Sequence, residues 1–210
     1  MTESPHPLAD VLRAAAEGVF PPADGSVTVL PPWKGVHAVV SFSAHAFLLT
    51  DHDPADVEAR KLDAYGGALH PSHQLWLAGA LNIGSIDVVM VCRARPGVSL
   101  PARGDIDDHA RVDRAQRHRR DVRVLADDEG LVTIGRGLVD RWEVSVELFD
   151  GVDHGRGAGC RLIEAGLAAV PPGEWVWAQV APGNGASVRA FLAAGFRPVC
   201  GEVLFSDHPD

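Results

Sequence analysis

The chain has little cysteine and no long apolar run. Its 210 residues include three cysteines, Cys92, Cys160 and Cys200, which are scattered and form no Cys-x-x-Cys pair. We therefore expect free thiols in a reducing compartment and a cytoplasmic protein. No apolar stretch approaches the roughly 20 residues that a membrane-spanning helix needs. The first residues also lack the basic flank and apolar run of a signal peptide, so we expect neither a leader nor a membrane partner.

Positive charge and metal-ligand patterns are also scarce. The formal net charge of −9 argues against a general nucleic-acid-binding protein, because contacts to phosphates need basic surface. The ten histidines show no His-Glu-x-x-His or other paired spacing, so we expect no metal site. One basic island interrupts the acidic trend: Arg111, Arg114, Arg117, His118, Arg119, Arg120 and Arg123. The acidic residues Asp113 and Asp121 are interspersed, which favours a solvated helix face over a dedicated anion site.

The order of helical and strand patterns predicts an α/β fold of the mixed α+β kind. After a turn-rich segment at 95–104, a charged helix over 107–119 precedes three strands, over 121–126, 131–138 and 142–149. Helices over 157–170 and 185–194 then alternate with strands over 175–180 and 199–205. A strand meander followed by this alternation indicates a mixed, mostly antiparallel sheet flanked by helices.

The N-terminal part has its own α/β pattern. We expect a helix over 7–18, a pair of antiparallel strands over 36–42 and 46–51, helices over 54–64 and 71–80, and a buried strand over 85–93. Asp53 is a suitable cap for the second of these helices, and Pro54 suits its first position. The turn-rich segment is the best linker, so we predict an N-terminal α/β half-domain over residues 1–104 and a second domain over residues 105–210.

A glycine-rich turn separates the strand at 142–149 from the following helix. In Asp153-His154-Gly155-Arg156-Gly157-Ala158-Gly159, a glycine occupies every second position. Such a turn leaves backbone N–H groups uncovered at a helix N-terminus, which suits a pyrophosphate. The alternative is a turn that serves only to let the helix pack closely on the sheet.

Two motifs in a fixed order resemble the GNAT superfamily of acyl-CoA N-acyltransferases. The run from His154 to Gly159 is similar to the family's acyl-CoA signature, Gln/Arg-x-x-Gly-x-Gly/Ala, with His in the first place. The later segment is similar to a second signature, in which an Asn precedes a helix that ends in Gly-Phe; its matching residues are Asn184, Ser187, Gly195 and Phe196. The resemblance covers about residues 120–206 and implies a GNAT-like fold.

The resemblance implies an acyl-CoA donor, acetyl-CoA, and an amine acceptor that attacks it directly in a ternary complex. It implies that the turn holds the CoA pyrophosphate through His154, Gly155, Arg156, Gly157, Ala158 and Gly159. It also implies that the backbone of the strand ending at Leu148 and Phe149 pairs with the pantetheine arm, and that Asn184, with Ser187 behind it, contacts that arm. Residues 1–104 look like a degenerate second copy of the fold; alternatively, they supply its usual first strand and helices. A homodimer is left open.

Amine acylation needs a base, and one face of the strand at 142–149 offers two carboxylates. Alternation puts Glu143, Ser145 and Glu147 on the face opposite Val144 and Val146. Glu147 and Glu143 are therefore the candidate general bases. The alternative is that this face is solvated or pairs with Arg136 and Arg141.

The family often has a tyrosine at the position of Phe191, where it protonates the departing thiolate, whereas this chain has a single tyrosine, Tyr65. Solvent or another residue must take that role. Four histidines are further candidates for acceptor contact, with surface or core positions as the alternative: His37, His45, His109 and His118. The sequence thus predicts an N-acyltransferase that moves an acetyl group from acetyl-CoA to a primary amine. The alternative function is a non-catalytic acyl-CoA-binding module.

Overall fold

The computed structural model describes residues 5–152 and 157–207. Its contacts divide the chain into two compact units, Met1–Val89 with Val199–Asp210 and Met90–Pro198. This division differs from the predicted boundary at residue 104. Residues 101–103 belong to the second unit because they pair along one of its strands, through Arg103 N to Val124 O at 3.0 Å and Ala126 N to Pro101 O at 3.2 Å. That residues 1–104 and 105–210 act as separate domains stays a prediction.

The first unit is an α/β assembly. Its elements are α1 (Pro7–Ala16), β1 (Val27–Leu30), β2 (His37–Phe42), β3 (His45–Leu49), α2 (Pro54–Ala59), η1 (Gly67–Leu69), α3 (Pro71–Ala78), β4 (Asn82–Ile83) and most of β10 (Arg197–Ser206). The predicted cap is present, since Asp53 accepts a hydrogen bond from Ala55 N at 2.8 Å. The helix it caps is shorter than predicted and ends at Ala59.

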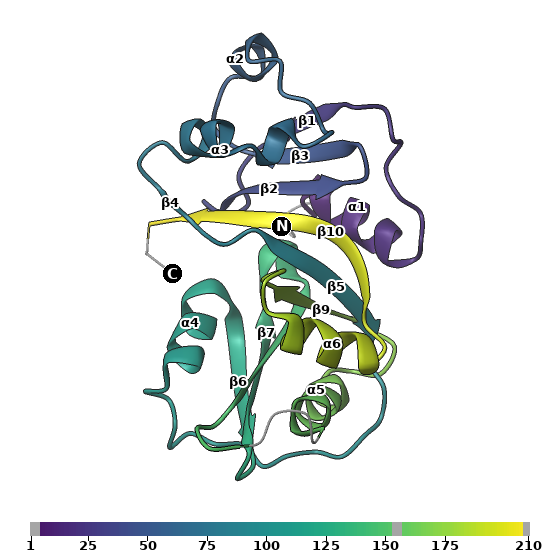
Figure 1. Ribbon diagram of the computed structural model, residues 1–210, viewed down its shortest axis with the longest axis vertical. Coiled ribbons are helices and arrows are strands. Elements are labelled where there is room, and N and C mark those ends of the chain that lie inside the picture. Colours follow the sequence, from purple (N-terminus) through teal and green to yellow (C-terminus); the bar gives the residue numbers. More distant parts are fainter. Residues whose placement is uncertain (1–4, 153–156, 208–210) are drawn as a thin grey trace. The chain divides into compact units, whose positions relative to one another are not determined.

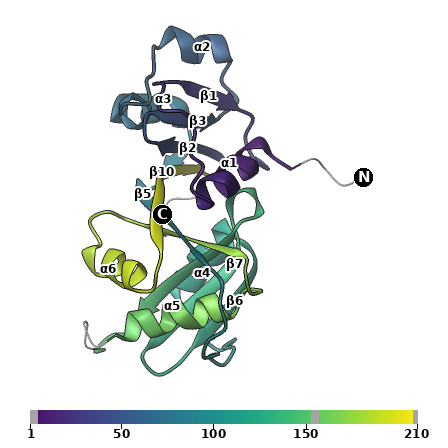
Figure 2. The same cartoon turned by 90° about the vertical axis from the view of Figure 1, so that its right-hand side faces the viewer.

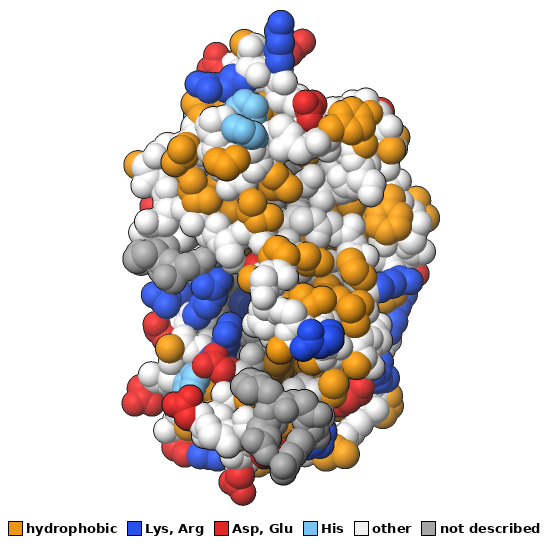
Figure 3. All heavy atoms as spheres, in the orientation of Figure 1, with side chains coloured by type: hydrophobic (Ala, Val, Ile, Leu, Met, Phe, Trp, Pro, Cys, Tyr) orange, Lys and Arg blue, Asp and Glu red, His pale blue; other side chains and the backbone are white. Residues whose placement is uncertain are grey.

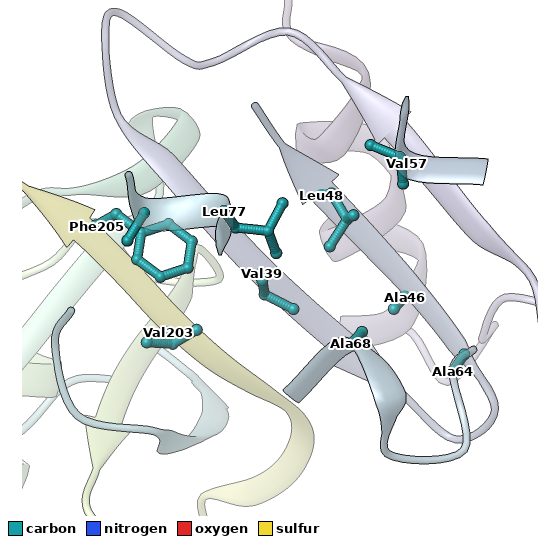
Figure 4. Packing of buried hydrophobic residues seen from close by; sticks show 10 residues of the cluster. Val39, Ala46, Leu48, Val57, Ala64, Ala68, Leu77, Val203 and Phe205 are labelled. Atoms are coloured by element: carbon teal, nitrogen blue, oxygen red, sulfur yellow. The ribbon is translucent and has the colours of Figure 1, made fainter. Parts of the chain in front are cut away.

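The core of the first unit lies between its strands and helices. β2 pairs with β3 and with β10 in antiparallel fashion, so that Val39 lies opposite both Leu48 and Val203. These residues pack with Leu77 of α3 and Val57 of α2 in one buried cluster (Figure 4). Figure 2 shows α3 and α1 on opposite sides of β2 and β3. The parallel strand β1, paired with β3, was not predicted from the sequence.

The second unit contains the motifs. Its elements are most of β5 (Asp87–Arg93), α4 (Ala110–His118), β6 (Arg120–Ala126), β7 (Gly130–Arg136), η2 (Leu138–Asp140), β8 (Trp142–Leu148), α5 (Ala158–Ala168), β9 (Trp175–Val180) and α6 (Gly185–Ala193). Every helix and strand predicted between residues 105 and 198 is present, with ends that shift by a few residues.

The strands of the second unit form a meander followed by one parallel pairing. β6, β7 and β8 are consecutive antiparallel neighbours, and β9 runs parallel to β8. α5 packs closely on one face: a Cβ on Gly166 would lie 2.7 Å from Val144 Cγ2. Figure 1 shows α4 on the other side of β6 and β7. A mixed, mostly antiparallel sheet flanked by helices is the predicted fold class, which is confirmed. Among the described residues, no helix combines the length and apolar character needed to cross a membrane.

Candidate active site

An opening between two parallel strands is the central feature of the second unit. β8 and β9 pair at Trp142 with Val176 and at Glu143 with Trp177, and the ladder ends there. β8 continues to Leu148 with β7 on its other side as far as Gly130. The edge of β8 that faces away from β7 is therefore unpaired with β9 over residues 144–148. An unpaired strand edge can accept an extended ligand through its N–H and C=O groups.

The backbone N–H and C=O groups of Leu148 and of Phe149 are not equally able to bind a ligand. Phe149 N donates to Glu129 O at 2.9 Å, and Phe149 O accepts from Val152 N at 3.2 Å, so both groups are used within the protein. Backbone groups alternate in direction along a strand, so those of Leu148 face the open edge of β8. Leu148 thus suits the pairing that the resemblance implies for a pantetheine arm better than Phe149.

The N-terminus of α5 follows β8 in the chain, and no side chain of the described residues caps it. Gly157 is the N-cap residue with φ of +86°, a left-handed conformation that favours glycine. Ala158 is buried and begins the helix. The first N–H groups of a helix have no partner within it, so they are available to an anion. His154, Gly155 and Arg156 lie outside the described residues.

Asn184 caps α6. Its Oδ1 accepts a hydrogen bond from Ser187 N at 3.1 Å. The backbone of Ser187 is therefore engaged with the cap. The Asn184 amide nitrogen is the part of the side chain that remains for the ligand contact implied by the resemblance.

Glu143 lies in a buried ion-pair cluster. Arg119 Nε is 3.0 Å from its Oε2 and Arg141 Nε is 2.8 Å from its Oε1, while the Glu143 and Arg119 side chains are 5% and 9% exposed. Burial alone would raise the pKa of Glu143, but Arg141 and Arg119 outweigh it and hold the pKa below its usual value. A buried carboxylate that binds two guanidinium groups is a poor proton acceptor.

The turn before β8 is shaped around this carboxylate. Leu138 N donates to Glu143 Oε1 at 3.3 Å. A Cβ on Gly137 would lie 2.1 Å from Glu143 Cδ, so a larger residue there would force the carboxylate to shift. Val139 has φ of +48°, which is unfavourable for a β-branched residue. The surroundings of Glu143 therefore indicate a structural anchor.

Glu147 has a more open environment on the same face. Arg111 of α4 donates through Nε to Glu147 Oε2 at 2.7 Å, and the two side chains are 33% and 38% exposed, respectively. The pair lies toward the end of β8, next to Leu148. Of the two candidate bases, Glu147 is the one that solvent and a small molecule can reach.

Several members of the basic island, on α4 and at the start of β6, are paired with acidic side chains. Arg117 pairs with Asp113 at 3.1 Å, and Arg120 pairs with Asp140. Figure 3 shows basic and acidic side chains beside one another in the region of α4. Arg119 departs from this pattern because it is buried on Glu143. Sequence reasoning missed Arg111 and Arg119 as partners of the glutamates, since nothing local relates residues so distant along the chain.

Three other residues considered for the site are engaged in packing, in a helix cap or in hydrogen bonds within the protein. Phe191 is 3% exposed and packs edge-to-face on Phe196, with ring centroids 4.9 Å apart. His109 caps α4 by accepting from Arg111 N at 3.1 Å. His45 is a buried residue whose ring nitrogens lie 3.0 Å from Asp24 Oδ1 and 3.1 Å from Thr28 Oγ1. Within the described part of the chain, no group of three His, Cys, Asp or Glu side chains is arranged to hold a metal ion.

No protein-family model matches the chain. No curated protein matches it significantly. A structure assigned to the GNAT family of acetyltransferases, from Novosphingobium aromaticivorans, is 20% identical, with a TM-score of 0.41, over 60% of this chain and 66% of its own.

Two further solved structures are similar in kind. A GNAT-family acetyltransferase from Colwellia psychrerythraea is 11% identical, with a TM-score of 0.37, over 59% of this chain and 56% of its own. A GCN5-related N-acetyltransferase from Kribbella flavida is 12% identical, with a TM-score of 0.45, over 99% of this chain and 97% of its own.

Proposed function

We propose that the chain is an acyl-CoA-dependent N-acyltransferase that moves an acetyl group from acetyl-CoA to a primary amine. The observation that carries this proposal is the parting of β8 from β9 after Glu143 and Trp177, directly before the N-terminus of α5. The open edge suits the amide groups of a pantetheine arm, and the helix N-terminus suits a diphosphate. The first of the two motifs that resemble the family ends at the N-terminus of α5, and the second begins at the cap of α6.

The residues present fit a CoA thioester. Backbone groups of Val144, Val146 and Leu148 face the open edge of β8 by alternation. Among the described residues, a Cβ on Gly157 would approach only Arg161 Nη1, at 3.7 Å. Arg161 itself pairs with Glu129 and adds positive charge beside the helix start. The parts of the site assigned to His154, Gly155 and Arg156 rest on the sequence.

In this proposal Glu147 is the general base. Bound acetyl-CoA supplies an acyl group activated as a thioester. Glu147 removes a proton from the acceptor ammonium, because it is the reachable carboxylate on the strand that lines the opening. The proposal does not assign this role to Glu143, because Glu143 is buried and binds two arginines. Phe191 has no ionisable group, so the proposal assigns protonation of the departing thiolate to solvent.

The test combines binding and turnover. Calorimetric titration should show that acetyl-CoA binds, and a panel of amines should release free thiol. In Glu147→Gln we expect turnover to fall by about 10²–10⁴-fold with the affinity for acetyl-CoA unchanged. Glu164→Gln is the matched control, because Glu164 is 40% exposed and pairs with Arg95 at 2.5 Å; its turnover should equal that of the parent.

Two results would count against the proposal. If acetyl-CoA at millimolar concentration gives neither heat nor thermal stabilisation, the assignment to acyl-CoA fails. If acetyl-CoA binds tightly but no amine releases thiol, a non-catalytic acyl-CoA-binding module becomes the better description.

A further inference from the structure

We propose that the acceptor is a free α-amino acid, held by the Arg111–Glu147 pair through both its carboxylate and its ammonium group. This inference rests on the proposed function, since it names the substrate class of the same site. It follows from which polar atoms of the two side chains are already hydrogen-bonded, and from how far the side chains are exposed.

Glu147 engages only one of the hydrogen-bond donors of the Arg111 side chain. A guanidinium group has five N–H donors, and the contact to Glu147 Oε2 is made by Nε at 2.7 Å. Among the described residues, no acceptor bonds the two terminal nitrogens of Arg111. These nitrogens form the edge that binds carboxylates in a bidentate manner. With a third of the side chain exposed, this edge can meet a ligand.

The backbone around Arg111 is fixed. His109 caps α4 through Arg111 N at 3.1 Å, so Arg111 lies in the first turn of an anchored helix. The next residue, Val112, is fully buried against the sheet in a cluster that also contacts Phe149. A rigid attachment lets the guanidinium group select geometry as well as charge.

A free α-amino acid matches this exposed ion pair. Its ammonium and carboxylate groups are attached to one carbon, so the molecule carries its own adjacent pair of opposite charges. Placed beside Arg111 and Glu147 in the opposite sense, it brings its ammonium group to Glu147 and its carboxylate to the free edge of Arg111. A simple amine meets only Glu147, and a peptide N-terminus has no adjacent carboxylate.

The two other arginines on this face cannot take the carboxylate, since Arg141 binds Glu143 with its side chain 4% exposed and Arg119 is similarly engaged. Arg119 uses Nε on Glu143, at 3.0 Å, and Nη1 on Ser145 Oγ and Thr133 Oγ1, at 3.2 and 3.3 Å, respectively. Its side chain is 9% exposed. Arg111 is therefore the guanidinium group on the polar face of β8 that is both reachable and open to a further acceptor.

The chemical step balances with this assignment. Glu147 takes one proton from the ammonium group, and the freed nitrogen lone pair forms the C–N bond to the acyl carbon. The C–S bond breaks, and its electron pair stays on sulfur. One of the two protons lost by nitrogen ends on the thiol and the other in solvent, so the products are an N-acetyl amino acid, free CoA and one proton.

The experiment compares each of the twenty L-amino acids with its own carboxamide, which keeps the amine and removes the negative charge. Thiol release should favour the best amino acid over its amide by about 10- to 100-fold in kcat/KM, mainly through KM, as expected for charge-assisted hydrogen bonds. Arg111→Gln should remove this preference and leave the affinity for acetyl-CoA unchanged. Arg117→Gln is the matched control on α4, because Arg117 pairs with Asp113, and it should keep the preference.

The outcomes separate this inference from the proposed function. Turnover of simple amines and amides at the same efficiency as amino acids overturns the inference and leaves the acyltransferase standing. If no acceptor turns over, calorimetry with the same amino acids and amides, with and without CoA, decides. An amino acid that binds more tightly than its amide only when Arg111 is present supports the inference, and equal or absent binding overturns it.

Discussion

Glu143 Oε2 lies 3.0 Å from Arg119 Nε, and neither side chain is more than 9% exposed. Such a pair inside a protein is stable only when its remaining polar atoms also find partners. Here the second carboxylate oxygen binds Arg141 at 2.8 Å, and the second half of the Arg119 fork reaches Thr133 and Ser145. The cluster lies where β8 and β9 are still paired, just before they part. It fixes the closed end of the opening from which we infer ligand binding.

Replacing Glu143 should therefore cost stability. In Glu143→Gln two buried guanidinium groups lose their counter-charge, and the free energy of unfolding should fall by about 3–5 kcal/mol. Denaturant titration measures this change. Glu164→Gln, in a partly exposed pair, should cost at most about 1 kcal/mol.

The same cluster predicts how stability depends on pH. The folded-state pKa of Glu143 is lowered because its arginine partners outweigh burial, so its stabilisation is present above the unfolded pKa of about 4.3 and is lost as the pH falls through the folded value. The difference in unfolding free energy between parent and Glu143→Gln should shrink as the pH falls below about 4. A difference that stays constant down to pH 2 would contradict this account.

Local patterns in the sequence were sufficient for most of the elements. The alternation of polar and apolar residues in β8 predicted both the strand and its two faces, because side-chain period is a local property. β1 was missed since Val27–Leu30 is a short strand whose only described ladder is a parallel one with β3, which no local signal announces. The predicted end of α2 was too late, because no glycine or proline marks the point near Arg60 where the chain leaves the helix.

The candidate site was predicted in part. One alternative prediction was that the polar face of β8 pairs with Arg136 and Arg141. Arg141 does bind Glu143, whereas Arg136 stacks on Trp142, with Arg136 Cζ 3.7 Å from the ring centroid. The partners Arg111 and Arg119 come from α4 and the residue that follows it, far along the chain. Their contacts depend on how α4 packs on the sheet, so charge patterning alone indicated only a solvated helix face.

The two described glycines of the turn should respond differently to substitution. Gly157→Ala forces a left-handed conformation on an L-residue and should cost roughly 1–2 kcal/mol of stability. Gly159 lies in the first turn of α5, where an added Cβ would meet Ala190 Cβ at an ordinary 3.7 Å. Gly159→Ala should therefore fold at least as stably as the parent, as alanine favours helix.

Gly159→Ala thus isolates the approach of the ligand. If phosphate groups lie against the backbone of this turn, the affinity for acetyl-CoA should fall about tenfold or more with no loss of thermal stability. Calorimetry and a thermal melt on the same preparation measure both quantities. An unchanged affinity would mean that the turn serves helix packing alone.

Asn184 combines a structural hydrogen bond with the proposed contact to the ligand, and two substitutions separate these roles. Its Oδ1 accepts from Ser187 N at 3.1 Å, so Asn184→Ala should cost about 1 kcal/mol through loss of the helix cap. Serine is an equally good capping residue, so Asn184→Ser should keep the stability of the parent while removing the amide N–H donors. If these donors bind the pantetheine arm, the affinity of Asn184→Ser for acetyl-CoA should fall by about 1–1.5 kcal/mol. Parent-like affinity in Asn184→Ser would show that Asn184 acts only as the cap of α6.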